Sequence, residues 1–491
     1  MWRKLSVMLA FILELVLLLV SCGSGEVQSK TPVENPNTVD SAETTADEFG
    51  YVAPNVEKED FGGRKFNIIY PQWSLYNHYY FATEYNGEVV NDAIYDRARY
   101  VEEMLNIKFE YITRGYIETI LPEVQKVVRA GDPGYDLALT HCATSLLSYV
   151  TDKLLLNWND IPGADLSMLY WNQSVRESFE VYGMLPFMSS DYILPDVNSI
   201  FFNKGIIDDM KLEDPYELVL SGKWTWDKLK AMATEATKDL NGNSKMDDED
   251  QYGFVGERGW QFTSALISCN QFLFGKGPDN LPAILCDNEK TQNVLDLICG
   301  IIHNKSIAYT WAHSSAYDPN QGGKPPVDFR SNRSLFYLTP LSLATTFRDA
   351  EVDYGIIPLP KYDEAQDNYL TLNWAGFMCV PASVSDPRLV GLVSELLAAE
   401  SSRTVIPAFY DVLLGEKIAR DPISKKMLDI IFEWNVYDLG VNLGYYGLFS
   451  SQIDSSKPNN SRYLRAQRNT IEKVISDYVE GCKEYMELTS K

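Results

Sequence analysis

Strand-like and helix-like patterns alternate along residues 61–140. Short apolar runs are separated by segments in which apolar residues recur at helical spacing. The predicted strands cover 65–70, 107–112 and 135–140. The predicted helices cover 91–104 and 117–130, with Asn91 and Asp92 as the cap of the first and Gly131 as the stop of the second. This order of elements predicts a parallel sheet covered by helices.

A second α/β region follows over residues 199–381, and the pattern then becomes helical to the end of the chain. Its predicted strands cover 199–202, 334–337, 352–360 and 377–381. Its predicted helices cover 226–237, 263–274 and 291–303. A chain of 491 residues with two such regions has room for two or three domains.

The first 22 residues have the pattern of an export signal. Arg3 and Lys4 precede an apolar run over 5–20, which small residues close just before Cys22. The run is too short for a comfortable membrane span. We therefore expect residues 1–21 to be a signal peptide and the folded body to lie outside the cytoplasmic membrane.

The cysteine that follows these small residues resembles the one in the bacterial lipobox. That resemblance implies cleavage before Cys22 and a lipid on its thiol, which anchors the protein to the cell membrane. The segment 22–60 is rich in Ser, Thr, Pro, Asn and Glu, and this composition predicts a disordered tether after the lipidated residue. An ordinary signal peptide with an incidental cysteine is the alternative.

Composition narrows the classes of partner. The chain has 68 acidic and 43 basic residues, for a net charge of −25. We exclude nucleic acid as a partner, because phosphate binding requires clustered Lys and Arg. The same charge argues against broad contact with anionic lipid, so the lipid on Cys22 would hold the membrane. Aromatic residues make up 12% of the chain and offer flat surfaces to a ligand or to a core.

The sequence carries no common catalytic or metal signature. It has no GxSxG elbow, HExxH motif or phosphate-binding loop, and its four histidines form no HxxxH pair. The cysteines other than Cys22 are scattered without a CxxC pair, so we expect mostly buried free thiols. They are Cys142, Cys269, Cys286, Cys299, Cys379 and Cys482. We therefore expect no enzyme and no catalytic cofactor.

One acidic loop has the oxygen spacing of a calcium-binding loop. In residues 239–250, oxygen side chains fall at positions 1, 3, 5, 9 and 12, and position 7 would lend its backbone carbonyl. The candidate ligands are Asp239, Asn241, Asn243, Lys245, Asp247 and Asp250. Ser244 stands at position 6, where the sharp turn favours glycine. We expect a structural Ca²⁺ here, and the alternative is an acidic solvated turn.

Several stretches in a fixed order carry a family resemblance. They are 202–204, 214–219, 222–227, 251–254, 354–362 and 380–381, with the acidic loop before the fourth of them. In combination they are similar to the extracellular solute-binding lipoproteins of bacterial ABC importers. The resemblance is to the carbohydrate-binding group that includes maltose-binding protein, and it covers roughly residues 60–480.

The resemblance implies a two-lobed periplasmic-binding-protein-like α/β fold of type II, with a hinge between the lobes and a helical C-terminal part. The N-lobe would hold 61–183 plus 330–365, and the C-lobe would hold 184–325 plus 370–485. The lobes would close over a ligand in the cleft between them. A membrane permease would then recognise the closed form of this monomer.

A sugar has apolar faces and hydroxyl edges, so its site needs aromatic planes and polar side chains. The candidates are Trp73, His141, Asp191, Tyr192, Trp260, Trp374, Tyr445 and Tyr446. Core packing is the alternative for each of them. The expected function is to bind a carbohydrate, such as an oligosaccharide, or another small solute, and to deliver it to an ABC permease. Alternatives are a surface glycan-binding or sensor-linked protein and, with less support, a glycan-active enzyme.

Overall fold

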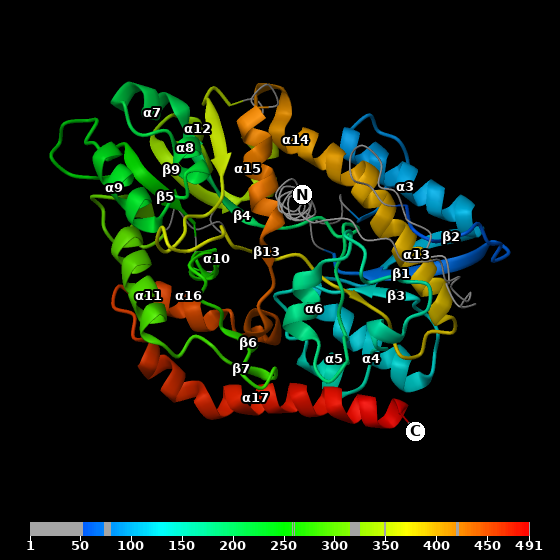
Figure 1. Ribbon diagram of the computed structural model, residues 1–491. Helices are drawn as coiled ribbons and strands as arrows, with labels where there is room; N and C mark the ends of the chain where they lie inside the picture. Colours follow the sequence, from blue (N-terminus) through cyan, green and yellow to red (C-terminus); the bar gives the residue numbers. More distant parts are fainter. Residues whose placement is uncertain are drawn as a thin grey trace, which may run out of the picture. The chain divides into compact units, whose positions relative to one another are not determined.

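Two β-sheets, each with its own helices, form the described part of the chain (Figure 1). The computed structural model describes residues 53–72, 80–257, 259, 261–314, 325–347, 350–418 and 422–490. These residues belong to one compact unit that spans 46–491. The predictions for Cys22, Trp73 and Trp260 lie outside the described residues. The body begins before residue 61, because Glu59 donates its backbone N–H to Met104 O at 3.0 Å.

The first sheet confirms the strand–helix–strand pattern of residues 61–140. Its strand order is β12-β3-β1-β2. The strands are β1 (Arg64–Tyr70), β2 (Ile107–Thr113), β3 (Leu137–Leu139) and β12 (Met378–Cys379). β1 pairs in parallel with β2 and β3, and β12 is antiparallel to β3. Helices α3 (Val89–Leu105) and α4 (Ile120–Ala130) make the crossovers that parallel pairing requires.

The start of α3 differs from the prediction that Asn91 and Asp92 cap it. The helix begins at Val89, and Glu88 precedes it without a side-chain cap bond. Asp92 lies in the first turn, where its Oδ1 accepts the backbone N–H of Asn86 at 3.0 Å. A carboxylate in the first turn still stabilises the positive end of the helix dipole. The acidic signal therefore marks the helix start but places it a few residues too late.

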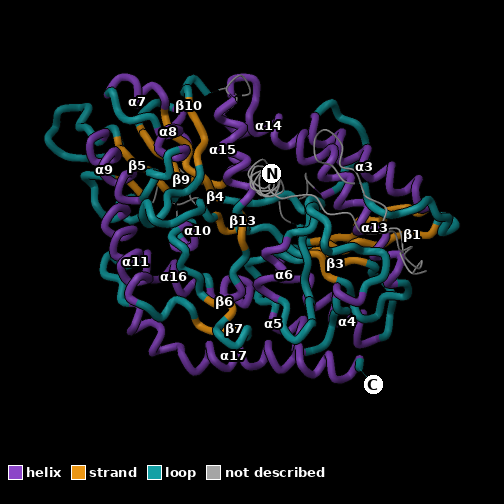
Figure 2. The backbone as a smooth tube through the Cα atoms, in the orientation of Figure 1, coloured by secondary structure: helices purple, strands orange, loops and turns teal. Residues whose placement is uncertain are grey.

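The second sheet has the strand order β10-β4-β9-β5-β8 and forms a separate group of strands from the first (Figure 2). Its strands are β4 (Asn198–Asn203), β5 (Tyr252–Gly256), β8 (Ala308–Thr310), β9 (Ser334–Pro340) and β10 (Tyr354–Ile357). β9 lies between β4, with which it is antiparallel, and β5, with which it is parallel. Mixed pairing of this kind confirms an α/β fold with two sheets.

These pairings divide the chain differently from the predicted lobes. The prediction puts 330–365 in the N-lobe, but β9 and β10 both pair with β4 in the second sheet. β9 is buried from Ser334 to Thr339, and a strand buried on both faces belongs in the interior of a sheet. Conversely, β12 comes from the segment predicted for the C-lobe and pairs with β3 in the first sheet. Local pattern identifies these strands but does not say which sheet they join.

The remaining elements surround both sheets. The helices of the first half are η1 (Ile117–Thr119), α5 (Leu147–Thr151), η2 (Trp158–Asp160), α6 (Gln173–Phe179), α7 (Lys204–Met210), α8 (Pro215–Leu220) and α9 (Trp226–Ala236). Those of the second half are α10 (Thr263–Ser268), α11 (Glu289–Ile302), α12 (Pro325–Arg330), η5 (Leu341–Phe347), α13 (Pro387–Glu400), η6 (Ser401–Val405), α14 (Ile406–Ile418), α15 (Pro422–Glu433), η7 (Val441–Tyr445), α16 (Gly447–Ile453) and α17 (Asn460–Thr489). Two short strand pairs complete the list, β6 (Phe274–Lys276) with β7 (Pro282–Ile284) and β11 (Thr371–Leu372) with β13 (Asn435–Val436). The helical C-terminal part is thus confirmed.

Helix α10 is shorter than the predicted 263–274. It ends at Ser268, after which Asn270 takes a left-handed backbone conformation with φ 58°. Phe274 then opens β6 instead of continuing the helix. The helical spacing of apolar residues continues past this turn, so the spacing alone did not reveal it. The signal is Asn270 itself, because asparagine adopts a left-handed φ more readily than most residues.

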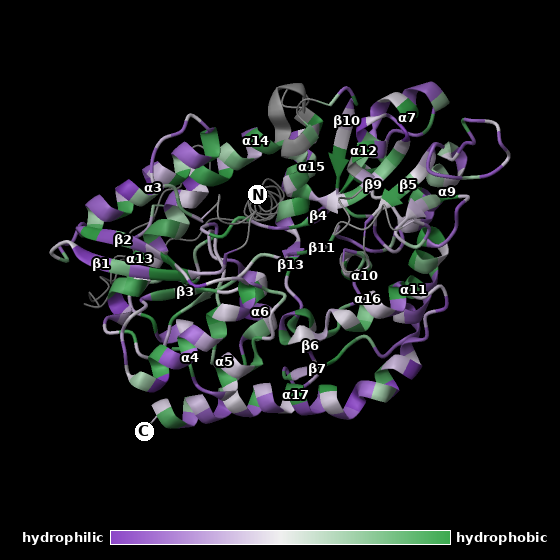
Figure 3. Cartoon of the chain, turned by 180° about the vertical axis from the view of Figure 1, so that it is seen from behind, coloured by the Kyte–Doolittle hydropathy of each residue, from purple (hydrophilic) through white to green (hydrophobic). Residues whose placement is uncertain are grey.

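Burial follows the apolar pattern of the elements. On α17, Leu464, Ile471, Ile475 and Tyr478 are buried at helical spacing, and Figure 3 shows hydrophobic and hydrophilic residues mixed along this helix. The six described cysteines are free thiols and all are buried, as expected. No helix in the described ranges is both long and apolar enough to cross a membrane.

Candidate functional site

Three segments that connect the two sheets lie side by side. β11 pairs in parallel with β13, and Val197 forms an antiparallel bridge with Asn373. The backbone N–H of Trp374 donates to Asp196 O at 2.7 Å. The side chain of Asn373 donates to Asn435 Oδ1 at 3.1 Å. The connections are therefore hydrogen-bonded to one another through both backbone and side chains.

A fourth connection is helical. Helix α13, the five-residue π-helix η6 and α14 follow each other without a break. Side chains of α13, such as Leu396, belong to the main hydrophobic core, whereas Val405 and Phe409 belong to a second core beside β9 and β10. A π-turn inside a long helix is common at functional positions. Here it falls where the helix passes from one core to the other.

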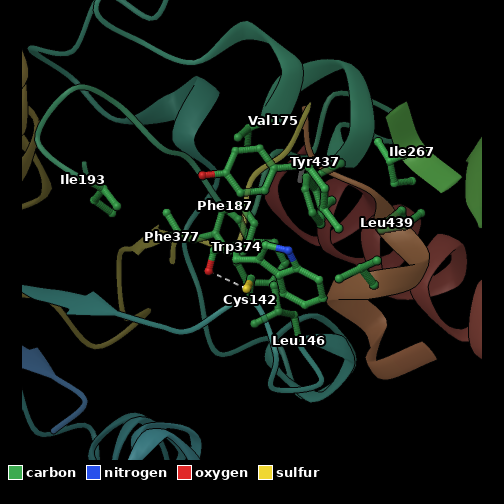
Figure 4. Packing of buried hydrophobic residues seen from close by; sticks show 14 of the residues in the cluster. Cys142, Leu146, Val175, Phe187, Ile193, Ile267, Trp374, Phe377, Tyr437 and Leu439 are labelled. Carbon is green, nitrogen blue, oxygen red and sulfur yellow. Dashed lines mark hydrogen bonds between the residues drawn. The ribbon is translucent and has the colours of Figure 1, made fainter. Parts of the chain in front are cut away.

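A chain of hydrogen bonds runs beside these connections. The Cys142 thiol donates to Trp374 O at 2.6 Å (Figure 4). The indole Nε1 of Trp374 donates to Ser264 Oγ at 3.0 Å. Asn198 Nδ2 donates to the same serine oxygen at 2.9 Å. Asn442 Nδ2 donates to Cys142 O at 3.2 Å. We call these five residues the seam, since they join the loop after β3 to a connection, to α10 and to β4.

The seam leaves buried polar atoms without partners. Among the described residues, four buried side-chain atoms of the seam or of the start of α10 have no hydrogen-bond partner. They are Asn198 Oδ1, Gln261 Oε1, Thr263 Oγ1 and Asn442 Oδ1. All four groups are neutral, and three of the atoms are amide oxygens, which only accept hydrogen bonds. Each costs about 1–3 kcal/mol when left unpaired, so their concentration marks a place where another molecule would supply donors.

Two of the predicted ligand residues lie at the seam. Trp374 belongs to it, and Tyr446 meets the indole edge to face with ring centroids 6.2 Å apart. Trp374 is only 5% exposed, and Figure 4 shows it among buried residues such as Leu146 and Tyr437. The indole ring of Trp374 therefore packs in the hydrophobic core and also forms a hydrogen bond within the seam.

His141 and Tyr445 lie next to these residues. His141 immediately precedes Cys142, and its Nδ1 accepts the backbone N–H of Ala143 at 3.0 Å. Burial lowers the pKa of His141 to about 4, so the imidazole is neutral at pH 7. Tyr445 packs against Phe274, with ring centroids 5.4 Å apart. The structure thus brings four predicted residues together from distant parts of the chain.

Asp191 and Tyr192 lie in a neighbouring cluster around Arg97. The guanidinium carbon of Arg97 lies 4.7 Å from the ring centroid of Tyr192. Burial raises the pKa of Asp191 to about 7, and a hydrogen bond from Ser402 in the π-helix opposes that rise. Tyr192 is fully buried, whereas Asp191 is partly exposed.

Sequence reasoning missed the polar members of the site. Ser264 and Asn442 stand in apolar surroundings, and nothing in the sequence distinguishes them from satisfied core polar residues. Arg97 did carry a signal, because it lies on the same face of α3 as Ile94 and Val101. A charged residue inside an apolar stripe is uncommon, and this one is 0% exposed.

The acidic loop at 239–250 closes through its own hydrogen bonds. Asp239 accepts the backbone N–H groups of Gly242 at 2.6 Å and Ser244 at 2.8 Å. Ser244 has φ 63°, the left-handed conformation that a glycine would adopt without strain. No group of three or more His, Cys, Asp or Glu side chains among the described residues is placed to hold a metal ion. Calcium binding therefore stays a prediction.

Comparisons with known proteins address the fold. No protein-family model and no curated protein matches the sequence. An ABC substrate-binding protein from Listeria monocytogenes, solved with cycloalternan, has 14% identity and a TM-score of 0.52, covering 87% of this chain and 99% of that one. The chain has the fold of such two-lobed binding proteins. This confirms the predicted fold class.

Two further solved structures are similar over comparable lengths. The GacH receptor of Streptomyces glaucescens, solved unliganded and with acarbose, has 13% identity and a TM-score of 0.53, covering 85% of this chain and 99% of that one. UgpB from Mycobacterium tuberculosis, solved with glycerophosphocholine, has 13% identity and a TM-score of 0.52, covering 88% and 100%. The first is described as a substrate-binding protein and the second as a receptor, and the ligands of the three structures differ.

Proposed function

We propose that this chain is an extracytoplasmic solute-binding protein of an ABC importer, which binds a carbohydrate at the seam and delivers it to a membrane permease. The observation that carries the proposal is the group of four neutral, unpartnered polar atoms buried where the two sheets are connected. A sugar hydroxyl both donates and accepts hydrogen bonds. A hydroxyl-rich ligand would therefore satisfy the amide oxygens of Asn198, Gln261 and Asn442 and the Thr263 hydroxyl together.

The aromatic residues support the same ligand class. Trp374 and Tyr446 lie edge to face beside the seam, and aromatic planes pack well against the C–H faces of sugar rings. The indole N–H of Trp374 is already bound to Ser264, so the ring would be oriented before a ligand arrives. Preorganised side chains lower the entropy lost on binding.

The connections between the sheets supply a route for the ligand. Solute-binding folds of this kind open and close by hinge motion about a few connecting residues. In this chain the candidate hinge elements are β11, β13 and η6. Opening about them would separate Cys142, on the first sheet, from Asn198, on the second, and would admit a solute to the seam.

Further parts of the proposal concern the membrane anchor, the membrane partner and a structural metal ion. Cys22 would carry the lipid that anchors the protein, and an ABC permease would be its membrane partner. The acidic loop would hold a structural Ca²⁺, with Asp239, Asp247 and Asp250 as its charged ligands. We expect a monomer that binds the sugar without converting it chemically.

The proposal is tested by a thermal-shift screen against neutral and acidic sugars and oligosaccharides, followed by calorimetry on each hit. A ligand that binds only the folded state raises the melting temperature with concentration. We expect one glycan class to do so and to be recovered unchanged. No shift with any glycan would reject a carbohydrate ligand, and a consumed glycan would indicate an enzyme. Binding without growth or uptake defects in a deletion strain would favour the sensor-linked alternative.

Two variants locate the ligand at the seam. Gln261→Met and Thr263→Val remove unpartnered polar atoms at little change in volume, so the free protein should be as stable as the wild type or slightly more stable. Ligand affinity should fall about 10-fold in each variant, because a hydrogen bond to the sugar is lost. Unchanged affinity in both variants would place the ligand elsewhere.

A further inference from the structure

Arg97 is a buried cation that forms no ion pair with any residue in the described part of the chain. It is 0% exposed and lies on the apolar face of α3. Its Nη1 donates to Ser401 Oγ at 2.9 Å and its Nη2 donates to Tyr80 O at 2.6 Å. Both acceptors are neutral, and Nε has no hydrogen-bond partner among the described residues. A guanidinium has five N–H donors, and two of them make the bonds given above.

Other arginines of the protein show what is missing. Arg64 pairs with Asp136 at 2.5 Å, and Arg333 pairs with Asp328. Glu400 is near enough to influence the pKa of Arg97, but it forms its ion pair with Arg403. Burial of a guanidinium without an anion is strongly unfavourable. The fold therefore provides a positive charge whose counter-ion is not part of the described chain.

A second unpartnered donor lies against this cation. Tyr192 stacks on the guanidinium of Arg97, and no described residue forms a hydrogen bond with its buried hydroxyl. Tyrosine hydroxyls and arginine N–H groups are both donors to oxyanions. Two such groups in contact, both buried and both unsatisfied, form a donor set for an oxyanion group.

The pair adjoins the seam along the chain. Asp196 follows Tyr192 by four residues, and its backbone oxygen accepts the N–H of Trp374 at 2.7 Å. Trp374 belongs to the seam, so the Arg97 cluster and the seam are neighbours. The ring of Tyr80 also lies 6.3 Å from the ring of Tyr192, between centroids. Arg97 is also on α3 of the first sheet, whereas Tyr192 leads into the second, so hinge opening would change this contact.

We propose that Arg97 and Tyr192 bind an oxyanion group, a carboxylate or a phosphate, on the solute whose hydroxyls are bound at the seam. The ligand is then an acidic sugar, either a sugar acid or a sugar phosphate, and not a neutral glycan. Arg97 supplies the charge and planar N–H groups, and Tyr192 supplies one hydroxyl. This inference rests on the function proposed above and adds the chemical class of the substrate.

The test is calorimetry with matched oligosaccharides that differ at one position, which carries glucose, glucuronate or glucose 6-phosphate. The proteins compared are the full chain, Arg97→Met, Tyr192→Phe and the control Arg99→Met. Arg99 is on the same helix but is exposed and pairs with Glu102 at 2.6 Å. We expect the wild type to bind one acidic form at least about 10-fold more tightly than the neutral form, the scale of one charge-assisted hydrogen bond.

The variants then distinguish direct binding of the acidic group from a structural role of the same side chains. Arg97→Met should remove the preference for the acidic form, Tyr192→Phe should reduce it by about threefold or more, and Arg99→Met should leave it unchanged. The glucuronate and phosphate arms tell which oxyanion is bound. Tyr192→Phe keeps the ring that stacks on the guanidinium, so it tests the site even if Arg97→Met does not fold.

Three results would overturn the inference. If the wild type binds the neutral form as tightly as the acidic forms, the oxyanion is wrong while the proposed carbohydrate function stands. If Arg97→Met weakens neutral and acidic ligands equally, Arg97 acts by holding α3 to Ser401 and not by binding the ligand. If no sugar binds but inorganic phosphate still raises the melting temperature of the wild type and not of Arg97→Met, an anion site exists and the carbohydrate function fails.

Discussion

Ser264→Ala is the most direct test of the seam, because one oxygen serves two buried donors. Ser264 Oγ accepts from Trp374 Nε1 at 3.0 Å and from Asn198 Nδ2 at 2.9 Å. The substitution leaves both N–H groups buried without an acceptor. Each unpaired buried donor costs about 1–3 kcal/mol, and local relaxation recovers part of it. We therefore expect the free energy of unfolding to fall by about 2–4 kcal/mol.

Ser268→Ala is the matched control on the same helix. Ser268 is also fully buried, and its Oγ accepts a single N–H, from Trp226 Nε1 at 3.1 Å. The Ser268→Ala substitution leaves one buried donor without an acceptor instead of two, so we expect the free energy of unfolding to fall by about 1–2 kcal/mol. Both changes replace serine by alanine in α10, so differences in helix propensity cancel.

Urea unfolding measures the two losses, provided that the slope with denaturant is unchanged. Calorimetry with the ligand found in the screen supplies a second readout. Ser264→Ala should lower affinity about 10-fold, because Trp374 and Asn198 lose their fixed orientation, whereas Ser268→Ala should stay within about twofold. Equal stability losses and equal affinities in the two variants would refute the idea that the seam orients the ligand site.

Two further predictions concern the acidic loop and the partly buried carboxylate of Asp191. Asp239→Ala should lower the melting temperature even in chelator, because the backbone N–H groups of Gly242 and Ser244 lose their acceptor. The substitution should also abolish the rise in melting temperature that millimolar Ca²⁺ produces in the wild type. An equal rise in both proteins would reject calcium at this loop. Burial raises the pKa of Asp191 to about 7, so the folded state holds this proton more tightly than the unfolded state. The free energy of unfolding should therefore fall by about 2–4 kcal/mol as pH rises from about 4 to about 7. The urea midpoint of Asp191→Asn should not show this fall with pH. The same pH dependence in both proteins would contradict a raised pKa at Asp191.

The sequence predicted those parts of the fold that depend on local pattern. The three strands and two helices of residues 61–140 follow from apolar spacing and from the turn at Gly131, which has φ 64°. The assignment of β9 and β10 to the second sheet could not be read in the same way. It depends on pairing with β4, which lies more than a hundred residues away from both, and no local period encodes such a contact.

The site divides along the same line. Trp374, Tyr446 and His141 were predicted because aromatic and polar residues in loops beside strands suit a sugar ligand. Ser264 and Asn442 were missed, because only the fold shows that the first holds two donors and that the second leaves an oxygen unpaired. What distinguishes these residues is the absence or sharing of partners, which is a property of three-dimensional contacts and not of residue type.

At Arg97, the sequence pattern and the three-dimensional contacts give complementary evidence. A charge at the position between Ile94 and Val101 breaks the apolar stripe of α3, and a helix that only needed to pack would carry a leucine or methionine there. The structure adds that no carboxylate in the described part of the chain forms an ion pair with Arg97, although the chain has 68 acidic residues and a net charge of −25. With acidic side chains so abundant, a shortage of carboxylates does not explain why Arg97 has no ion-pair partner among the described residues. A buried charge of this kind is a candidate functional group, and under the function proposed above the group that it acts on is the ligand.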